Sequence, residues 1–350
     1  MIVYSKTANV APASYGKIET PIKMIIEHES DYQKKKGGVC DWLFNVEKSN
    51  HFGETIVSQL GFDIFQGTQE GDEMQKDCVY QTYSKFIEHI QYMKEFVITA
   101  EMMEDAQYGI GADAKRRAEA FTRAYYKTMH KLATAALANG HLGSTYFGGQ
   151  ELDLNTADGL PLFSSKHKYG YNKGYQPNYF YGDVFKTGSG DSRVYSAEVF
   201  EEKLAYFATK IRNMKDELGE PLGYTADTII LPGNRPFAES IVKKVCGSYG
   251  SASAPGQINI QYGNWNIVIM PSWETEEDRV MIMSSEANRN LAGNMFFNRV
   301  PLTVSSYVDP HTSNHIFTGR CRFGIGFPTY KHILLAVDSE TAIDNAEAIE

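Results

Sequence analysis

Residues 79–98 read VYQTYSKFIEHIQYMKEFVI, and the conformation of this stretch decides the fold. Its aromatic and β-branched residues favour a strand, and the polar, glycine-bounded run GTQEGDEMQKD (67–77) before it suits a turn. A helical stripe fits as well, formed by Tyr83, Phe86, Ile90, Met93 and Val97. Periodicity alone leaves the two interpretations even.

If the stretch is extended, residues 60–98 form a hairpin whose first strand begins near 62–65 (FDIF). Strands of about fourteen residues reach roughly 45 Å, whereas a compact chain of this length has a radius of gyration of about 20 Å. An isolated two-stranded ribbon is only marginally stable in water. Such a hairpin is therefore expected to lie on another subunit.

A long helix is expected after the hairpin, over about 113–139. Its apolar stripe, with spacings of three and four, consists of Ala114, Ala118, Phe121, Tyr125, Met129, Leu132 and Ala136. A short helix through Ala106, capped by Thr99, is expected before the long helix. Gly140 is expected to end the long helix in the left-handed conformation. At 1.5 Å per residue this spine helix is about 40 Å long.

The rest of the chain is a mixture of helices and strands. Residues 1–53 look irregular, with a possible strand over 22–26, and are interpreted as an arm that depends on a partner or on the rest of the chain for order. An ordinary N-terminal subdomain is the alternative. Residues 141–195 are loop-rich. Further helices are expected at 196–218 and 236–245, strands at 227–232, 264–270 and 279–284, and an antiparallel sheet with strands near 295–308, 314–325 and 331–337.

Composition excludes several classes of protein. The 350 residues are 42% hydrophobic with 22 Tyr and 19 Phe, so a large core forms without metal or disulfide. The four cysteines form no CxxC pair, and no run approaches the roughly 20 apolar residues of a membrane span. The N-terminus does not resemble a signal peptide, so the protein is expected to stay where it is made. With a net charge of −9, the surface is not expected to bind nucleic acid tightly, because such binding needs clustered Lys and Arg to neutralise phosphates.

A search for catalytic spacing finds only weak signals. There is no phosphate-binding GxxxxGK[ST], no HExxH and no GxSxG. His311 and His315 are interpreted as a polar turn, and residues 276–278 (EED) as a solvated hairpin turn. Asp158 and His167, nine residues apart, could be an acid–base pair, but ordinary turn and surface roles are favoured. No catalytic residue, cofactor or metal is therefore predicted.

Four motifs, taken in order, resemble the tailed-bacteriophage major capsid proteins, especially the Mu-like major head subunits. They are FVITAEMMED (96–105), DGLPLFS (158–164) with His167, ADTIILP (226–232), and GRCRFGIGF (319–327). The resemblance covers about 60–340. It implies the Hong Kong 97-type fold, of class α+β, and it settles residues 79–98 as strand.

The resemblance also implies a domain plan and a function. The plan has an N-arm (1–55), an E-loop (56–98), a P-domain with the spine helix (99–145), an A-domain (146–295), and P-domain return strands with a C-terminal tail (296–350). The implied function is a virion head protein that forms hexamers and pentamers of an icosahedral shell around double-stranded DNA. Assembly is expected in the host bacterial cytoplasm, with a separate scaffolding protein, a portal and decoration proteins as partners.

Candidate intersubunit contacts are charged or aromatic residues of the hairpin tip, the arm and the spine helix. They are Phe65, Glu70, Glu73, Lys76, Lys34, Lys35, Arg116 and Arg117. Two alternatives stay open: an encapsulin-like compartment that encloses a cargo enzyme, and a soluble two-domain hydrolase that uses Asp158 and His167.

Overall fold

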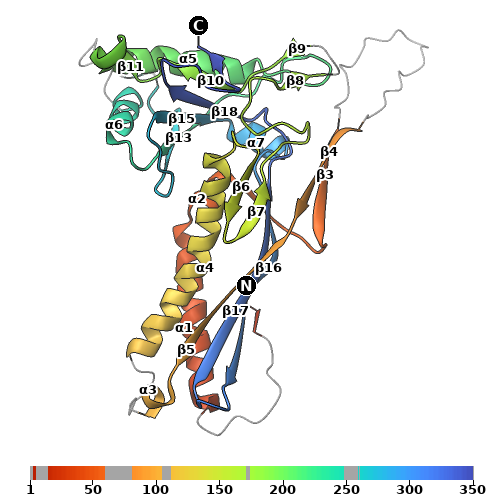
Figure 1. The fold of residues 1–350 in the computed structure, drawn as a ribbon, viewed down its shortest axis with the longest axis vertical. Coiled ribbons are helices and arrows are strands. Elements are labelled where there is room, and N and C mark those ends of the chain that lie inside the picture. The colour runs from red at the N-terminus through yellow and green to blue at the C-terminus, as the bar shows by residue number, and fades with distance from the viewer. Residues whose placement is uncertain are drawn as a thin grey trace, which may run out of the picture. The chain divides into compact units, whose positions relative to one another are not determined.

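The computed structural model describes residues 3–4, 15–59, 81–104, 112–170, 174–247, 259 and 261–349. Helices and strands are mixed along the chain, so the predicted α+β class is confirmed (Figure 1). The chain divides into two compact units. Unit 1 comprises Met1–Glu54, Glu88–Ala133 and Phe296–Ile325, and unit 2 comprises Thr55–Ile87, Thr134–Met295 and Gly326–Glu350.

Unit 1 is built on a sheet with the strand order β1-β16-β17-β5, in which β2 also pairs with β16. The strands are β1 (Val3–Tyr4), β2 (Asn45–Lys48), β5 (Ile90–Ile98), β16 (Met295–Val308) and β17 (His315–Gly326). Strands β5 and β17 are antiparallel, with Phe96 opposite Phe317. The Phe96 ring stacks on Phe317 at 5.0 Å and meets Phe121 at 4.9 Å between ring centroids. The strand interpretation of 79–98 is thereby confirmed for its second half.

The spine helix is α4 (Ala112–Ala138), within one residue of its predicted bounds. Its predicted stripe is buried except for Tyr125, which is half-buried. The predicted left-handed stop at Gly140 is wrong, because Gly140 is not among the residues with positive φ. Glycine is required there for space: a Cβ atom would lie 2.9 Å from Cε2 of Phe163.

Residues 15–36 correct the prediction of an irregular arm with a strand over 22–26. They form helix α1 (Tyr15–Lys36), with Pro21 inside it. Ile22 and Ile26 are fully buried in one cluster with Ala114 and Ala118 of α4. Burying two isoleucines contributes about 3–6 kcal/mol, which offsets the roughly 3 kcal/mol that an internal proline costs. Tertiary packing therefore overrides the local signal, and the short helix α2 (Val39–Leu43) follows.

Unit 2 contains a sheet with the strand order β14-β13-β15-β18-β10-β19. Its strands are β10 (Tyr179–Gly182), β13 (Thr228–Pro232), β14 (Asn266–Met270), β15 (Asp278–Met283), β18 (Ile333–Asp338) and β19 (Glu347–Ala348). Helices α5 (Ala197–Arg212) and α6 (Pro236–Val245) pack into one apolar cluster with this sheet. Helix α6 and strands β13, β14 and β15 confirm the predictions, whereas α5 ends six residues before the predicted 218.

One strand departs from the predicted return sheet. Strand β18 does not continue the sheet of β16 and β17; it pairs antiparallel with β15 and parallel with β10. All six residues of β18 are buried, which is typical of a central strand covered on both faces. Because every position of β18 is buried, its own pattern does not indicate which sheet it joins.

The remaining elements are short. They are the hairpins β3–β4 (Gly53–Gln59 and Gln81–Glu88), β6–β7 (Ser144–Phe147 and Gln150–Asp153), β8–β9 (Lys168–Tyr169 and Gly174–Tyr175) and β11–β12 (Lys186–Thr187 and Val194–Tyr195), and the helices α3 (Ala100–Glu104), η1 (Gly190–Ser192) and α7 (Ser285–Asn290). Thr99 caps α3 as predicted, because its Oγ1 accepts from the backbone N–H of Met102 at 3.3 Å. The predicted end at Ala106 lies outside the described residues.

The packing of α1 gives a first testable prediction. Ile26→Ala should lower the free energy of unfolding by about 2–5 kcal/mol, because it leaves a cavity between α1 and α4. Met24→Ala, on the exposed side of the same helix, should change it by less than about 0.5 kcal/mol. Urea unfolding followed by circular dichroism measures both. Equal stability of the two variants would show that α1 is not part of the core of unit 1.

Candidate functional site

The β3–β4 ribbon lies at the start of the predicted E-loop, and its described strands have seven and eight residues. The predicted hairpin of two strands of about fourteen residues over 60–98 is wrong in its second strand, because β5 (Ile90–Ile98) pairs with β17 in the sheet of unit 1 and not with the ribbon. The predicted start of the first strand near 62–65 lies outside the described residues.

Burial alternates strictly from Ser84 to His89, with Ser84, Phe86 and Glu88 exposed and Lys85, Ile87 and His89 buried. This period of two is what a strand produces and a helix does not. Within the described residues, β3 and β4 pair with each other and with no third strand. The ribbon therefore presents two open edges and one exposed face.

Two contacts within unit 2 anchor the base of the ribbon. The Lys85 amine, only 8% exposed, pairs with the carboxylate of Asp153 on β7. Ile87 packs against the backbone of Gly326, where an added Cβ would lie 2.8 Å from the Ile87 side chain. The Lys85–Asp153 ion pair and the contact of Ile87 with Gly326 together fix the position of β4 at this end of the ribbon.

The predicted intersubunit residues occupy different places. Phe65, Glu70, Glu73 and Lys76 lie outside the described residues. Lys34 and Lys35 lie in the last turn of α1, where the Lys34 amine is 3.6 Å from Asp31. Arg116 is exposed and lies 3.6 Å from Asp113. Arg117 donates to the backbone oxygen of Val97 at 2.6 Å, so part of its guanidinium is used within unit 1.

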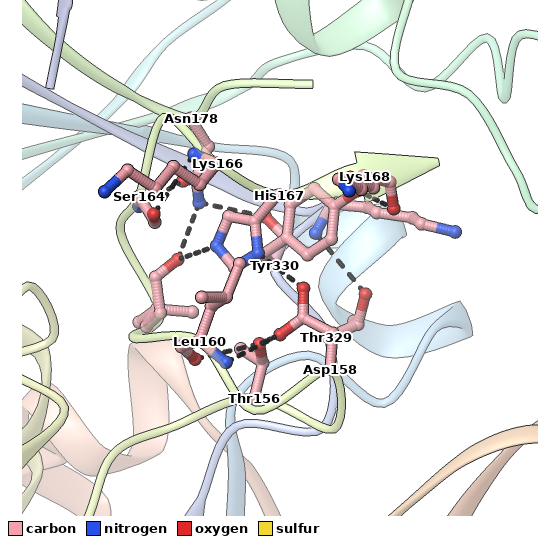
Figure 2. A network of polar contacts seen from close by, with 12 residues as sticks. Thr156, Asp158, Leu160, Ser164, Lys166, His167, Lys168, Asn178, Thr329 and Tyr330 are labelled. Carbon is pink, nitrogen blue, oxygen red and sulfur yellow. Dashed lines mark hydrogen bonds and ion pairs between the residues drawn. The ribbon is translucent and has the colours of Figure 1, made fainter. Parts of the chain in front are cut away.

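Asp158 and His167, the weakly predicted acid–base pair, do meet. His167 Nδ1 lies 2.6 Å from Asp158 Oδ2, and Nε2 donates to the backbone oxygen of Leu162 at 3.2 Å (Figure 2). The His167 side chain has no exposed surface, and its ring stacks on Tyr330 with 3.8 Å between centroids. The predicted surface role of His167 is therefore wrong, although the turn at Asp158 is present.

The polar network around this pair holds the loop together. Asp158 Oδ1 accepts from the Thr156 hydroxyl and from the Leu160 backbone N–H. Asn178 donates to the Leu162 oxygen at 2.8 Å, and its own oxygen accepts from the Ser164 N–H at 2.9 Å (Figure 2). Each buried polar atom named here has a partner, as buried polar groups require. The loop is thereby fixed in one conformation.

The electrostatics of the pair favour a structural ion pair. Burial opposes ionisation of Asp158, but the hydrogen bond and charge of His167, with the Thr156 hydroxyl, outweigh burial and lower the pKa of Asp158. Burial also raises the pKa of Tyr330 well above its usual value. Because both His167 nitrogens are engaged and the ring is enclosed, proton transfer to a substrate would require the network to open. The geometry therefore supports a structural role: the hydrogen-bonded pair of Asp158 and His167, called the loop clamp below, holds the loop from Thr156 to His167 in one conformation.

Sequence reasoning missed a second buried charge cluster in unit 2. Asp278 was expected in a solvated turn, but it is 2% exposed and begins β15, directly opposite Asp338 of β18. Asp278 Oδ2 accepts from the Tyr195 hydroxyl at 2.7 Å and lies 2.5 Å from the Lys186 amine. Asp338 accepts three backbone N–H bonds from Val184, Phe185 and Lys186, and Arg193 lies 2.7 Å from its other oxygen.

These buried carboxylates are matched by nearby cations. Burial opposes protonation of Lys186, but the hydrogen bond and charge of Asp278 outweigh it and raise the pKa of Lys186. The signal that could have found the cluster is that Asp278 directly precedes RVMIM, a strand that reads as fully buried. The cluster joins strands β15 and β18 to the loop before β11, and its role is structural.

No group of three or more His, Cys, Asp or Glu side chains in the described part of the chain is placed to hold a metal ion. His311 lies in the turn after β16, as the turn interpretation predicted, whereas His315 is the first residue of β17. None of the helices described is both long and apolar enough to cross a membrane.

Comparison with known proteins gives structural matches alone. No family model matches the sequence, and no curated protein matches it. The chain is similar to the capsid of a native GTA particle (12% identity, 86% of this chain and 90% of that chain, TM-score 0.49) and to the capsid of Myoviridae phage XM1 (13%, 86% and 92%, 0.48). It is also similar to a chain of Mycobacterium phage Patience (10%, 98% and 94%, 0.49). The function must be inferred from the chain's own residues.

The loop clamp gives a second prediction. Asp158→Asn should lower the free energy of unfolding at pH 7 by about 1–3 kcal/mol, because it removes the carboxylate that is hydrogen-bonded to the buried His167 ring. Since the pKa of Asp158 is lower in the folded state, its contribution is present above the unfolded pKa of about 3.9 and is lost as pH falls through the folded value. The variant should therefore lose part of the acid sensitivity of the native chain.

The control for this prediction is Asp113→Asn, which removes one partner of the exposed pair with Arg116. It should cost less than about 1 kcal/mol. Denaturant unfolding between pH 3 and pH 7 follows all three proteins. If Asp158→Asn were no less stable than the control, the clamp would have no structural role.

Proposed function

We propose that the chain is the structural subunit of a closed shell, a major capsid protein of the tailed-phage head type. The observation that carries this proposal is the β3–β4 ribbon, which pairs with no third strand within the described residues. Edge strands with unpaired N–H and C=O groups are templates for pairing with another chain. A subunit that anchors such a ribbon firmly at its base, at Lys85 and Ile87, holds it ready for a neighbouring copy.

The surface of the ribbon supports the same conclusion. Phe86 lies on its outer face and is 51% exposed. Burying one phenylalanine contributes about 1.5–3 kcal/mol, and ladder hydrogen bonds along an edge add to it. Each contact is modest, but a closed shell repeats it in every subunit, so the sum is large. Other large apolar side chains exposed by more than half include Met24, Trp42, Met93, Tyr146 and Phe237.

The finer features of the proposal come from the resemblance of the four motifs. The shell is icosahedral, with hexamers and pentamers of this chain around double-stranded DNA, and it forms in the cytoplasm of the bacterial host with a scaffolding protein, a portal and decoration proteins. The domain plan proposed is the one that the resemblance implies, with an N-arm, an E-loop, a P-domain and an A-domain. The chain has 43 Asp and Glu against 34 Lys and Arg, and this excess of negative charge suits a shell wall that does not bind the enclosed DNA tightly.

The intersubunit contacts proposed are Phe65, Glu70, Glu73 and Lys76 of the E-loop and Lys34, Lys35, Arg116 and Arg117 of α1 and α4. For the four residues of α1 and α4, long cationic side chains near helix ends suit contact with the acidic surface of another copy. No catalytic step is assigned to the Asp158–His167 pair, because both ring nitrogens of His167 are engaged in the clamp.

The proposal predicts the behaviour of the purified chain. The native protein should sediment as closed particles of megadalton mass, and electron microscopy should show uniform shells. Deleting residues 66–78, or replacing Phe86 with Glu, should leave a folded subunit by circular dichroism and reduce the yield of closed shells at least tenfold. Phe86→Tyr keeps the ring and should assemble normally.

Two outcomes would contradict this proposal. One is a native chain that stays a monomer or small oligomer at high concentration. The other is a normal yield of shells from the deletion variant. Particles that hold a protein cargo in place of nucleic acid would instead identify an encapsulin-like compartment.

A further inference from the structure

Unit 2 carries a groove with an unusual lining beside helix α5. The groove has a volume of about 410 Å³ and lies between the β8–β9 hairpin and the C-terminal half of α5. Three tyrosines and two lysines line it: Tyr169, Tyr175, Tyr206, Lys210 and Lys215. No carboxylate is among its described lining residues, although the chain as a whole carries an excess of nine negative charges. The groove is therefore a local site of positive charge.

The lysines of this region contact aromatic rings in place of carboxylates. The Lys210 amine lies 5.0 Å from the centroid of Tyr206, and the Lys215 amine lies 4.8 Å from that of Tyr169. Lys168, which lines a neighbouring cavity that shares Tyr175 with the groove, lies 5.3 Å from the centroid of Tyr175. Within the described residues none of the three forms an ion pair, in contrast to Lys85, Lys186 and Lys331 of the same unit. Ring contacts hold these amines in place and leave their charge unneutralised.

The floor and one wall of the groove are rigid. Gln176, 8% exposed, accepts from the Lys215 N–H at 3.0 Å and donates to the sulfur of Met214 at 3.0 Å. Asp216 then accepts from the backbone N–H groups of Leu218, Gly219 and Glu220, at distances of 2.8–2.9 Å. The segment after α5 is thereby fixed against the β8–β9 hairpin, so the lysines are pre-organised for a ligand.

The ring of Tyr175 is the part of the lining that is most open. It is 66% exposed and also lines a second, larger cavity of about 750 Å³, which Lys166 and Lys168 border. Tyr175 therefore lies between two pairs of lysines, Lys210 and Lys215 of the groove and Lys166 and Lys168 of the larger cavity. Asp158 also lines the larger cavity, but its carboxylate is engaged by His167 and Thr156; Glu347 is the other carboxylate there.

We propose that this groove binds single-stranded nucleic acid, with phosphates held by Lys168, Lys210 and Lys215 and an unstacked base on Tyr175. Positive charge that follows a groove, interleaved with aromatic rings, is the arrangement by which proteins bind single strands without sequence preference. A duplex offers phosphates but keeps its bases stacked. An acidic peptide offers carboxylates but gains less from the exposed ring. The inference does not depend on the proposed shell function.

The test is fluorescence anisotropy of the purified full-length chain with a labelled deoxythymidine dodecamer. Binding should weaken with salt, with a slope of about 2 in log Kd against log salt, since three phosphate contacts at about 0.7 each are displaced. Lys210→Glu with Lys215→Glu should weaken binding at least tenfold. The same charge change on helix α6, Lys243→Glu with Lys244→Glu, should have less than a threefold effect.

The stacking step has its own variants. Tyr175→Ala should weaken binding about tenfold, whereas Tyr175→Phe should bind as the native chain does, because the ring is kept. Tyr146→Ala, which removes another exposed ring of unit 2, is the control and should have no effect. No binding at low salt, equal affinity for a duplex or a polyglutamate peptide, or an equal loss in both lysine pairs would each overturn the proposal. Circular dichroism of every variant separates loss of binding from loss of fold.

Discussion

The structure depends on a simple constraint: two paired strands satisfy each other's hydrogen bonds along one edge each, and their outer edges stay open. In the β3–β4 ribbon these edges belong to strands of seven and eight residues. The unit anchors the ribbon at one end through Lys85 and Ile87 and pairs it with no third strand among the described residues. Water can solvate the edges, but a two-stranded ribbon gains little stability in this way. A strand from another copy of the chain would satisfy the same groups and cover Phe86.

How much could be predicted from the sequence depends on whether a residue's environment is local. The spine helix and α6 were predicted closely, because stripes spaced by three and four and a proline at the first position of a helix are local signals. Helix α1 was missed because Ile22 and Ile26 gain their stability from α4, about ninety residues away. Strand β18 was assigned to the wrong sheet because a fully buried strand carries no alternation that distinguishes its neighbours. Asp278 was missed because its cations come from other segments.

Charge is organised differently inside and outside unit 2. Inside, Asp158, Asp278 and Asp338 each meet a histidine, lysine or arginine, and each accepts at least one further hydrogen bond. Removing one partner from such a pair is costly, because a buried charge remains. On the surface near α5, the amines of Lys168, Lys210 and Lys215 lie over tyrosine rings. In the buried pairs the charges neutralise each other and fix loops. In the lysine–tyrosine contacts the positive charge of the amine remains available to a ligand. An acidic chain can therefore repel a duplex as a whole and still bind an anion at one place.

Because residues 15–36 form a helix, they do not support assembly in the way that an extended arm would. The N-terminal arm was expected to depend on a partner or on the rest of the chain for its order. Helix α1 buries Ile22 and Ile26 within unit 1, where the Ser30 and Tyr126 hydroxyls form a hydrogen bond of 2.7 Å. That segment obtains its order from its own chain. The case for a shell therefore depends on the ribbon, supported by exposed side chains such as Met24 on the outer side of α1. A subunit of this kind has a stable interior before assembly, so the contacts between copies need to supply only the energy of association.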